Sequence, residues 1–138
     1  EVYESLLDEQ DDRIIILSEE DTALVNALQR RAAVVLQKSL REGFGLTVTE
    51  AMWKGAPVIG GNVGGIRHQI TDGENGYLVD SVEEAATRMV DLIQHPERGK
   101  RMGERARETV RKRFLLTHLL GDYLDLFGAF ETQYHLVD

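Results

Sequence analysis

The chain has 138 residues, 42% of them hydrophobic and 29% charged, which is enough for one globular domain with a single core. Its formal net charge of −8 argues against a general nucleic-acid-binding role, and the lack of cysteine excludes disulfides, thiol catalysis and cysteine-ligated metals. No apolar run approaches the roughly 20 residues that span a bilayer, and the acidic N-terminus is unlike a signal peptide, so we expect a cytoplasmic protein without a membrane span.

The first part of the chain has the pattern of strand, helix and strand. Residues 13–17 (RIIIL) form a continuous apolar run, which is typical of a strand buried on both faces. Asp21 is suited to cap a helix that runs to about Arg31, with one face formed by Val25, Leu28 and Ala32. Residues 33–36 (AVVL) predict a second strand, and residues 37–45 a loop.

A short helix and two further strands are predicted next. The helix runs from about Val48 to Lys54, because Gly55 suits the position after a helix and Pro57 prevents its continuation. Residues 57–60 (PVIG) and 76–79 (GYLV) are the third and fourth strand candidates. Strands that alternate with helices over short loops predict an α/β fold with a doubly wound parallel sheet.

The rest of the chain predicts helices. Ser81 and Glu84 have the spacing of a capping box at the start of a helix that ends at His95, with an apolar stripe of Val82, Ala86, Met89 and Ile93. The next helix covers residues 96 to about 113 and directs inward Met102, Ala106 and Val110. A last apolar helix covers about residues 115–127, and residues 128–138 form an unassigned tail.

The stretch from Glu42 to Glu50 (EGFGLTVTE) carries the strongest functional pattern. It lies between a predicted strand and a predicted helix, where ligands bind in open α/β sheets. Gly43 and Gly45 leave room for a ligand, and the N–H groups at the start of the helix suit a phosphate. Carboxylates on both sides are good acceptors for sugar hydroxyls, so the pattern suits a nucleotide sugar.

The same residues also have structural interpretations. Thr47 and Glu50 fit capping-box spacing, so Glu50 could serve the helix backbone instead of a ligand. Glu42 could be a solvated loop acid, and Gly43 and Gly45 could serve a turn only. On pattern alone these alternatives stay open.

Glu42 and Glu50, eight positions apart, resemble the E-x7-E motif of family 4 retaining glycosyltransferases with the GT-B fold. Residues 55–79 (GAPVIGGNVGGIRHQITDGENGYLV) are similar to the conserved run that follows this motif in the family, in the same order. Within the family, residues 37–60 are similar to trehalose synthases of the glycosyltransferring type. The resemblance implies the Rossmann-like C-terminal half of a GT-B enzyme, incomplete at its N-terminus.

That resemblance implies a role for each residue of the stretch. Glu42, the predicted catalytic-site residue, would accept hydrogen bonds from hydroxyls of the donor glucose near its 3-position. Donor contacts would come from the backbone of Gly43, Phe44, Gly45 and Leu46. Thr47 would contribute to the diphosphate and Glu50 would bind the ribose. The leaving diphosphate would be stabilised by positive groups and N–H donors, with no metal and no further cofactor beyond the nucleoside-diphosphate-glucose substrate.

The resemblance also implies missing parts. The chain begins at Glu1 without Met, and four strands are few for such a sheet, so we expect residues 1–127 to be a partial donor-binding domain followed by the tail at 128–138. The basic pair on the diphosphate and the N-terminal acceptor domain with its active-site histidine would lie upstream. The exposed C-terminal helix could then support a homodimer.

Other candidate groups have ordinary explanations. The basic helix at 96–113 could bind phosphate, but the Glu97–Arg101 and Glu108–Lys112 spacings favour a solvated face of ion pairs. Met52 and Trp53 fit a core better than a stacking platform. The four histidines, His68, His95, His118 and His135, do not have the spacing of metal ligands. We expect no catalytic role for Arg67 or His68.

Two other functions are alternatives to trehalose synthesis from a nucleotide sugar. Trehalose phosphorylases are relatives with a similar motif that use phosphate. A non-catalytic α/β association module, in which side chains close the glycine loop, would need no ligand.

Overall fold

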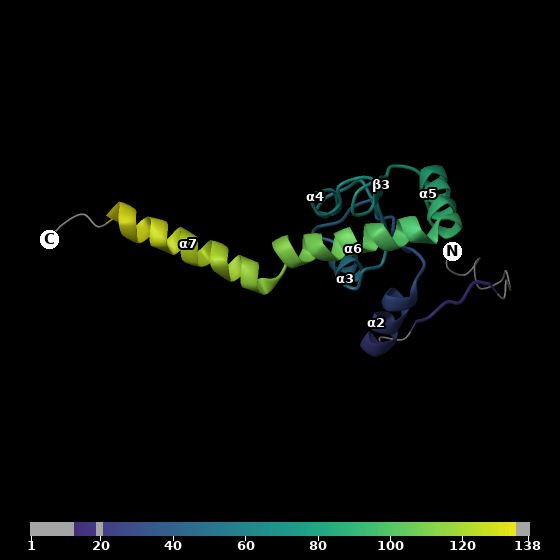
Figure 1. The fold of residues 1–138 in the computed structure, drawn as a ribbon, viewed down its shortest axis with the longest axis horizontal. Helices are drawn as coiled ribbons and strands as arrows, with labels where there is room; N and C mark the ends of the chain where they lie inside the picture. Colours follow the sequence, from purple (N-terminus) through teal and green to yellow (C-terminus); the bar gives the residue numbers. More distant parts are fainter. Residues whose placement is uncertain (1–12, 19–20, 135–138) are drawn as a thin grey trace.

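The computed structural model describes residues 13–18 and 21–134, which form a small α/β domain and a helix that projects from it (Figure 1). Its sheet has three parallel strands in the order β1 (Val35–Gln37), β2 (Val58–Gly61) and β3 (Tyr77–Val79). Val35 pairs with Val58 and Gly60 with Leu78, so the carboxyl ends of all three strands meet at one edge. The predicted α/β class and parallel sheet are confirmed.

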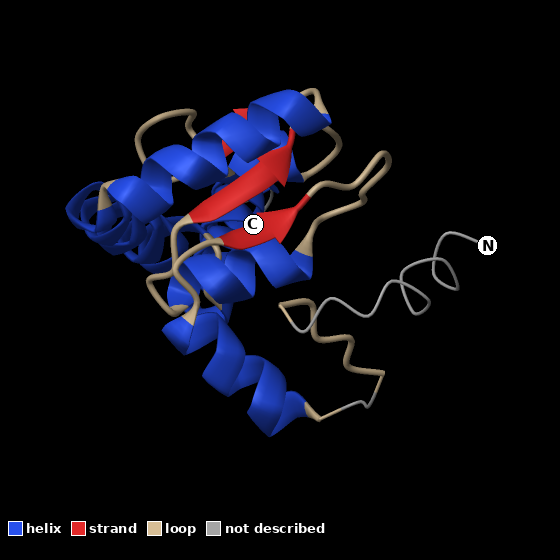
Figure 2. Cartoon of the chain, turned by 90° about the vertical axis from the view of Figure 1, so that its right-hand side faces the viewer, coloured by secondary structure: helices blue, strands red, loops and turns tan. Residues whose placement is uncertain are grey.

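Side chains on the central strand alternate between two cores. Val58 faces a cluster with α3 (Leu46–Trp53), α4 (Ile66–Gln69) and α6 (Pro96–Arg113), whereas Ile59 faces a cluster with β3 and α5 (Val82–Gln94). Both side chains are fully buried. Helices therefore lie on both faces of the sheet (Figure 2), and the central strand β2 is buried along its whole length.

Helix α2 (Thr22–Arg31) begins where its cap was predicted. The Asp21 carboxylate accepts hydrogen bonds from the backbone N–H groups of Ala23 at 2.8 Å and Leu24 at 3.0 Å. The apolar residues Val25 and Leu28 remain about half exposed.

Helices α3 and α6 approach each other closely because both contribute glycine at the contact. Gly55 follows α3 with a φ of +78°, the position predicted for it, and its carbonyl oxygen would lie 1.9 Å from a Cβ added at Gly103. The inward residues predicted for α6 are confirmed, since Met102, Ala106 and Val110 are buried.

The start of α5 is confirmed, but of its predicted apolar stripe only Met89 packs against the core. Ser81 Oγ accepts from the N–H of Glu84 at 3.0 Å, while the Glu84 carboxylate accepts from the N–H of Asp80 at 3.0 Å. Val82 and Ile93 are exposed, and Ala85 and Leu92 are buried instead. The helix carries two neighbouring apolar stripes, and contact with β3 and α6 selects the one that includes Leu92.

The predicted strand at residues 13–17 is also wrong. Residues 13–18 adopt no regular structure, and Ile14, Ile15 and Leu17 are each more than half exposed. A strand needs a partner for its backbone hydrogen bonds, and this segment pairs with no strand in the described chain. Its apolar character alone does not supply that partner.

Helix α7 (Leu116–Tyr134) continues beyond the predicted end at Phe127 and extends away from the domain (Figure 1). Much of the side-chain surface of its apolar residues up to Phe130 is exposed. No helix in the described part of the chain has the length and apolar character needed to cross a membrane.

Candidate functional site

The segment predicted to bind a ligand lies at the carboxyl edge of the sheet, directly after β1. Glu42 is half-buried, and its Oε1 accepts a hydrogen bond from the N–H of Gly43 at 3.1 Å. Ser39 Oγ donates to Glu42 Oε2 at 3.3 Å and itself accepts from Gln37 Nε2 at 2.9 Å. These contacts hold the Glu42 carboxylate in one place at the end of β1.

A second glycine pair, Gly64 and Gly65, lies directly against this loop. The carbonyl oxygen of Glu42 would lie 1.7 Å from a Cβ added at Gly64, and that of Gly43 would lie 2.4 Å from one added at Gly65. The N–H of Gly65 donates to the carbonyl of Gly43 at 2.8 Å. Residues that follow β2 therefore fix the shape of the loop that follows β1.

The loop ends at the start of α3 with unpaired backbone donors. Gly45 is the residue before the helix, has a φ of +86° and supplies no side-chain cap. In the described chain, no hydrogen bond involves the backbone N–H of Phe44, Gly45, Leu46 or Thr47. N–H groups in this arrangement, with the partial positive charge of a helix start, suit an anion.

Glu50 is exposed and lies on the same face of α3 as Leu46, one turn along. The helix begins at Leu46, so Thr47 is inside it and does not cap it. A capping-box role for Thr47 and Glu50 is therefore contradicted, and no hydrogen bond or ion pair of the Glu50 carboxylate occurs in the described residues. Glu50 is free to contact a ligand.

The loop is open to solvent instead of being closed by side chains. Phe44, Leu46 and Thr47 are exposed, with 46% and 67% of the side-chain surface accessible for the first two. The Phe44 ring meets the edge of Phe114 with a centroid distance of 5.9 Å and borders an open pocket of about 370 Å³ at the start of α7. Of the seven predicted site residues, all between Glu42 and Glu50, five are exposed, Glu42 is half-buried and Gly45 is buried.

Several residues near the site were not predicted. Asn62 follows β2 and Asp80 follows β3, and Asn62 Nδ2 donates to Asp80 Oδ2 at 3.4 Å, at the same edge of the sheet. Gln69, at the end of α4, is 1% exposed and donates through Nε2 to the carbonyl of Phe44. Asn62 and Asp80 directly follow apolar strands in the sequence, and this position is the signal that could have identified them.

The other candidate side chains are structural or peripheral. Met52 is buried as predicted, but Trp53 is 38% exposed, with the guanidinium of Arg107 located 5.3 Å from its ring centroid. Arg67 and His68 are exposed on α4. Among residues 13–18 and 21–134, no cluster of His, Asp and Glu is suited to a metal ion.

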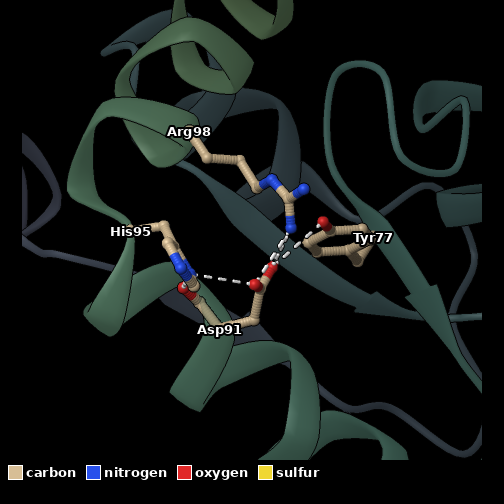
Figure 3. A network of polar contacts seen from close by, with 4 residues as sticks. All are labelled: Tyr77, Asp91, His95 and Arg98. Carbon is tan, nitrogen blue, oxygen red and sulfur yellow. Dashed lines mark hydrogen bonds and ion pairs between the residues drawn. The ribbon is translucent and has the colours of Figure 1, made fainter.

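The basic helix α6 forms some of the predicted ion pairs. Glu108 pairs with Arg111 at 2.7 Å and with Lys112 at 3.2 Å, and hydrogen bonding by Arg111 and then Lys112 lowers the pKa of Glu108 to about 2. No ion pair joins Glu97 to Arg101 in the described residues. Arg98 binds Asp91 instead, in a group with His95 and Tyr77 at the junction of α5 and α6 (Figure 3).

Comparison with known proteins agrees with this geometry. Residues 4–109 match the family described as "Glycosyl transferases group 1". Trehalose synthase from Pyrococcus horikoshii is 56% identical over 105 residues, which cover 76% of this chain and 25% of the relative. The chain thus spans about a quarter of the length of that curated relative.

Solved structures give the same fold. The chain is similar to sucrose-phosphate synthase from Thermosynechococcus elongatus, with a TM-score of 0.79 and 28% identity over 92% of this chain and 34% of that one. HepE from Anabaena, solved in complex with UDP-glucose, has a TM-score of 0.73 and 22% identity, over 93% of this chain and 37% of its own. These similarities confirm the predicted resemblance to GT-B glycosyltransferases.

Proposed function

The chain belongs to the glycosyl transferases group 1 family, and on that premise we propose that it binds the nucleotide-sugar donor of a retaining, trehalose-forming glycosyltransferase. In the proposed reaction, glucose moves from a nucleoside diphosphate to a second glucose. The bond between the sugar C1 and the diphosphate oxygen breaks, a bond from C1 to an acceptor hydroxyl oxygen forms, and the nucleoside diphosphate leaves together with the proton that this hydroxyl loses. The high identity to a trehalose synthase supports this reaction.

Each site residue has a chemical role in the proposal. The Glu42 carboxylate, held by Ser39 and Gly43, accepts hydrogen bonds from hydroxyls of the donor glucose. The backbone from Gly43 to Leu46 lies beside the sugar, and the N–H donors ending at Thr47 meet the charge that develops on the leaving diphosphate. Glu50, free of intramolecular partners in the described chain, accepts from the ribose hydroxyls.

One observation carries the proposal above the others: unpaired backbone N–H donors lie between two carboxylates, Glu42 and Glu50, in one loop and helix start. A phosphate needs the donors and a sugar needs the acceptors, so a ligand with both groups matches the whole surface. An association module does not need these donors and acceptors. It would also have a glycine loop closed by side chains, whereas this loop is open.

The acceptor side of the reaction is proposed to come from the remainder of the longer protein, since this chain spans about a quarter of the curated relative. We therefore expect the isolated chain to bind the donor without turning it over. The proposal also includes self-association through α7, whose apolar side chains are exposed.

Calorimetric titration with a nucleoside diphosphate and its glucose conjugate tests donor binding. We expect a Kd between about 1 μM and 1 mM, weakened roughly tenfold by Glu50→Gln through loss of a charged acceptor. Glu104→Gln, an exposed glutamate on α6, is the matched control and should bind like wild type. Absence of binding by both this chain and the longer protein would refute the proposal.

The direction of the reaction is tested separately on the longer protein. Trehalose is supplied with either a nucleoside diphosphate or inorganic phosphate. Consumption with the nucleoside diphosphate supports the proposed synthase. Consumption with phosphate alone would assign the protein to the phosphorylases instead.

A further inference from the structure

Gln69 has an unusual environment for an amide side chain. It is 1% exposed, and its Nε2 donates to the carbonyl oxygen of Phe44 in the loop of the candidate site. Its Oε1 is buried without any hydrogen-bond partner, the one such side-chain N or O atom in the described chain. A buried unpaired oxygen is destabilising, so this amide calls for an explanation.

The backbone around Gln69 is fixed by a second buried amide. Asn75, 3% exposed, donates through Nδ2 to the carbonyl of Gln69 at 3.2 Å and to Thr109 Oγ1 on α6 at 3.0 Å. The N–H of Thr71 donates to Asn75 Oδ1 at 2.7 Å. Gln69 is therefore a fixed donor that approaches the loop from the body of the domain.

The contact to Phe44 determines the direction of the next N–H group. The carbonyl of Phe44 and the N–H of Gly45 belong to one peptide unit, and in a planar trans peptide they point in opposite directions. Because the carbonyl is directed inward to Gln69, the N–H of Gly45 is directed away from Gln69. This N–H has no partner in the described residues.

Without such a contact the peptide would be easy to rotate. Gly45 has a φ of +86°, and glycine tolerates backbone angles on both sides of zero, so the Phe44–Gly45 peptide could turn over at low energy. Rotation would direct a carbonyl oxygen, which repels phosphate, to the place where an N–H donor is required. The unpaired Oε1 would then be the consequence of placing the Gln69 donor against this carbonyl.

We infer that Gln69 is a positioning residue that holds the Phe44–Gly45 peptide so that the Gly45 N–H faces the diphosphate of the donor. The inference rests on the proposed donor site for the identity of the ligand. The orientation of the peptide itself is independent of any ligand.

Gln69→Met tests the inference, because methionine has similar length and no hydrogen-bond donor. Gln29→Met is the matched control, since Gln29 is also a buried glutamine but contacts Lys54 at the far end of α3. Amide NMR spectra without ligand should show a shifted or broadened Gly45 resonance in Gln69→Met and an unchanged one in Gln29→Met.

Titration then measures the effect on binding. We expect Gln69→Met to bind a nucleoside diphosphate about tenfold more weakly, with unchanged binding of the nucleoside, which lacks phosphate. Gln29→Met should bind both as wild type does.

An unchanged Gly45 resonance in folded Gln69→Met would overturn the inference. Equal loss of nucleoside and diphosphate binding would also overturn it, because a purely structural role predicts that result. If wild type binds no nucleotide, the donor proposal fails, whereas the Gly45 resonance still decides whether Gln69 orients the peptide.

Discussion

Gly64 lies at the closest contact beneath the candidate site. It combines a φ of +46° with a backbone contact that leaves no space for a Cβ, since the carbonyl oxygen of Glu42 would be 1.7 Å away. An added methyl group therefore cannot be accommodated by rotating a side chain. The loop that carries Glu42 would have to move instead.

Gly64→Ala is expected to destabilise the domain and to weaken donor binding. Gly73→Ala is the control, because Gly73 has a φ of +74° but nothing within 4 Å of an added Cβ, so it measures the cost of the backbone angle alone. That cost is about 1–2 kcal/mol, and Gly64→Ala should exceed it by about 1–3 kcal/mol for the clash. Urea unfolding measures the free energy of unfolding of both variants. Equal decreases in the two variants would contradict the close contact at Gly64.

At the residue scale, the residues of the proposed site are contiguous in the sequence. Glu42 to Glu50 lie together because one loop and one helix turn carry them. Gln69 could not be found in this way, because its role depends on α4 packing against a loop 25 residues earlier. The capping-box role of Glu50 is excluded by the helix start at Leu46, which the sequence alone does not define.

At the scale of elements, an acidic side chain joins α5 to α6. Asp91 accepts from Arg98 Nη1 at 2.9 and 2.7 Å, lies 3.1 Å from His95 Nδ1 and accepts from the Tyr77 hydroxyl at 3.4 Å (Figure 3). The hydrogen bond from Arg98 is the main cause that lowers the pKa of Asp91 below its ordinary value.

This lowered pKa predicts a pH-dependent contribution to stability. The contribution is fully present above the ordinary aspartate pKa of about 4 and is lost as the pH falls through the lower folded-state value. Asp91→Asn should therefore lower the thermal midpoint at neutral pH, and the difference from wild type should shrink below about pH 4. Asp125→Asn on the exposed α7 is the control, and a difference that does not change with pH would contradict the pairing.

Three helix boundaries were predictable because local chemistry determines them. Asp21, Ser81 and Gly55 act at the chain positions where their side chains or backbone angles suggested. Burial was less predictable, since α5 could have turned either of two apolar stripes inward. The strand predicted at residues 13–17 was wrong because a strand depends on pairing with neighbouring strands as well as on its own residues.

At the scale of the whole molecule, α7 is the least covered element. The apolar side chains of Leu116, Leu120, Leu124 and Phe127 recur with helical spacing, and each is more than half exposed. An exposed apolar face of this kind is typical of an interaction surface, and a second copy of the chain could cover it.

We expect the isolated chain to self-associate through this face. Sedimentation velocity should show a concentration-dependent dimer, and Leu120→Glu combined with Leu124→Glu should give a monomer with an unchanged domain fold. The pair Glu104→Gln and Asp125→Asn, which leaves the apolar face intact, should remain dimeric. A wild-type chain that stays monomeric at high concentration would contradict the expectation.

The overall class followed from the alternation of strands and helices, and the parallel three-stranded sheet confirms it. The arrangement of its two cores did not follow from that alternation. Two neighbouring residues of β2, Val58 and Ile59, belong to different cores. A run of apolar residues does not indicate which helix packs on which face of the sheet.

The glycine pair after β2 also limits how this site could be reused in protein engineering. Gly64 and Gly65 press on the loop from Glu42 to Gly45, so the nine-residue EGFGLTVTE stretch does not hold its shape by itself. A designer who transplants that stretch into another α/β scaffold must transplant the Gly64–Gln69 segment as well, together with a strand spacing that brings the two into contact. The smallest transferable unit thus contains the loop after β1 and the segment after β2. It also includes α3 and β2, which lie between them in the chain.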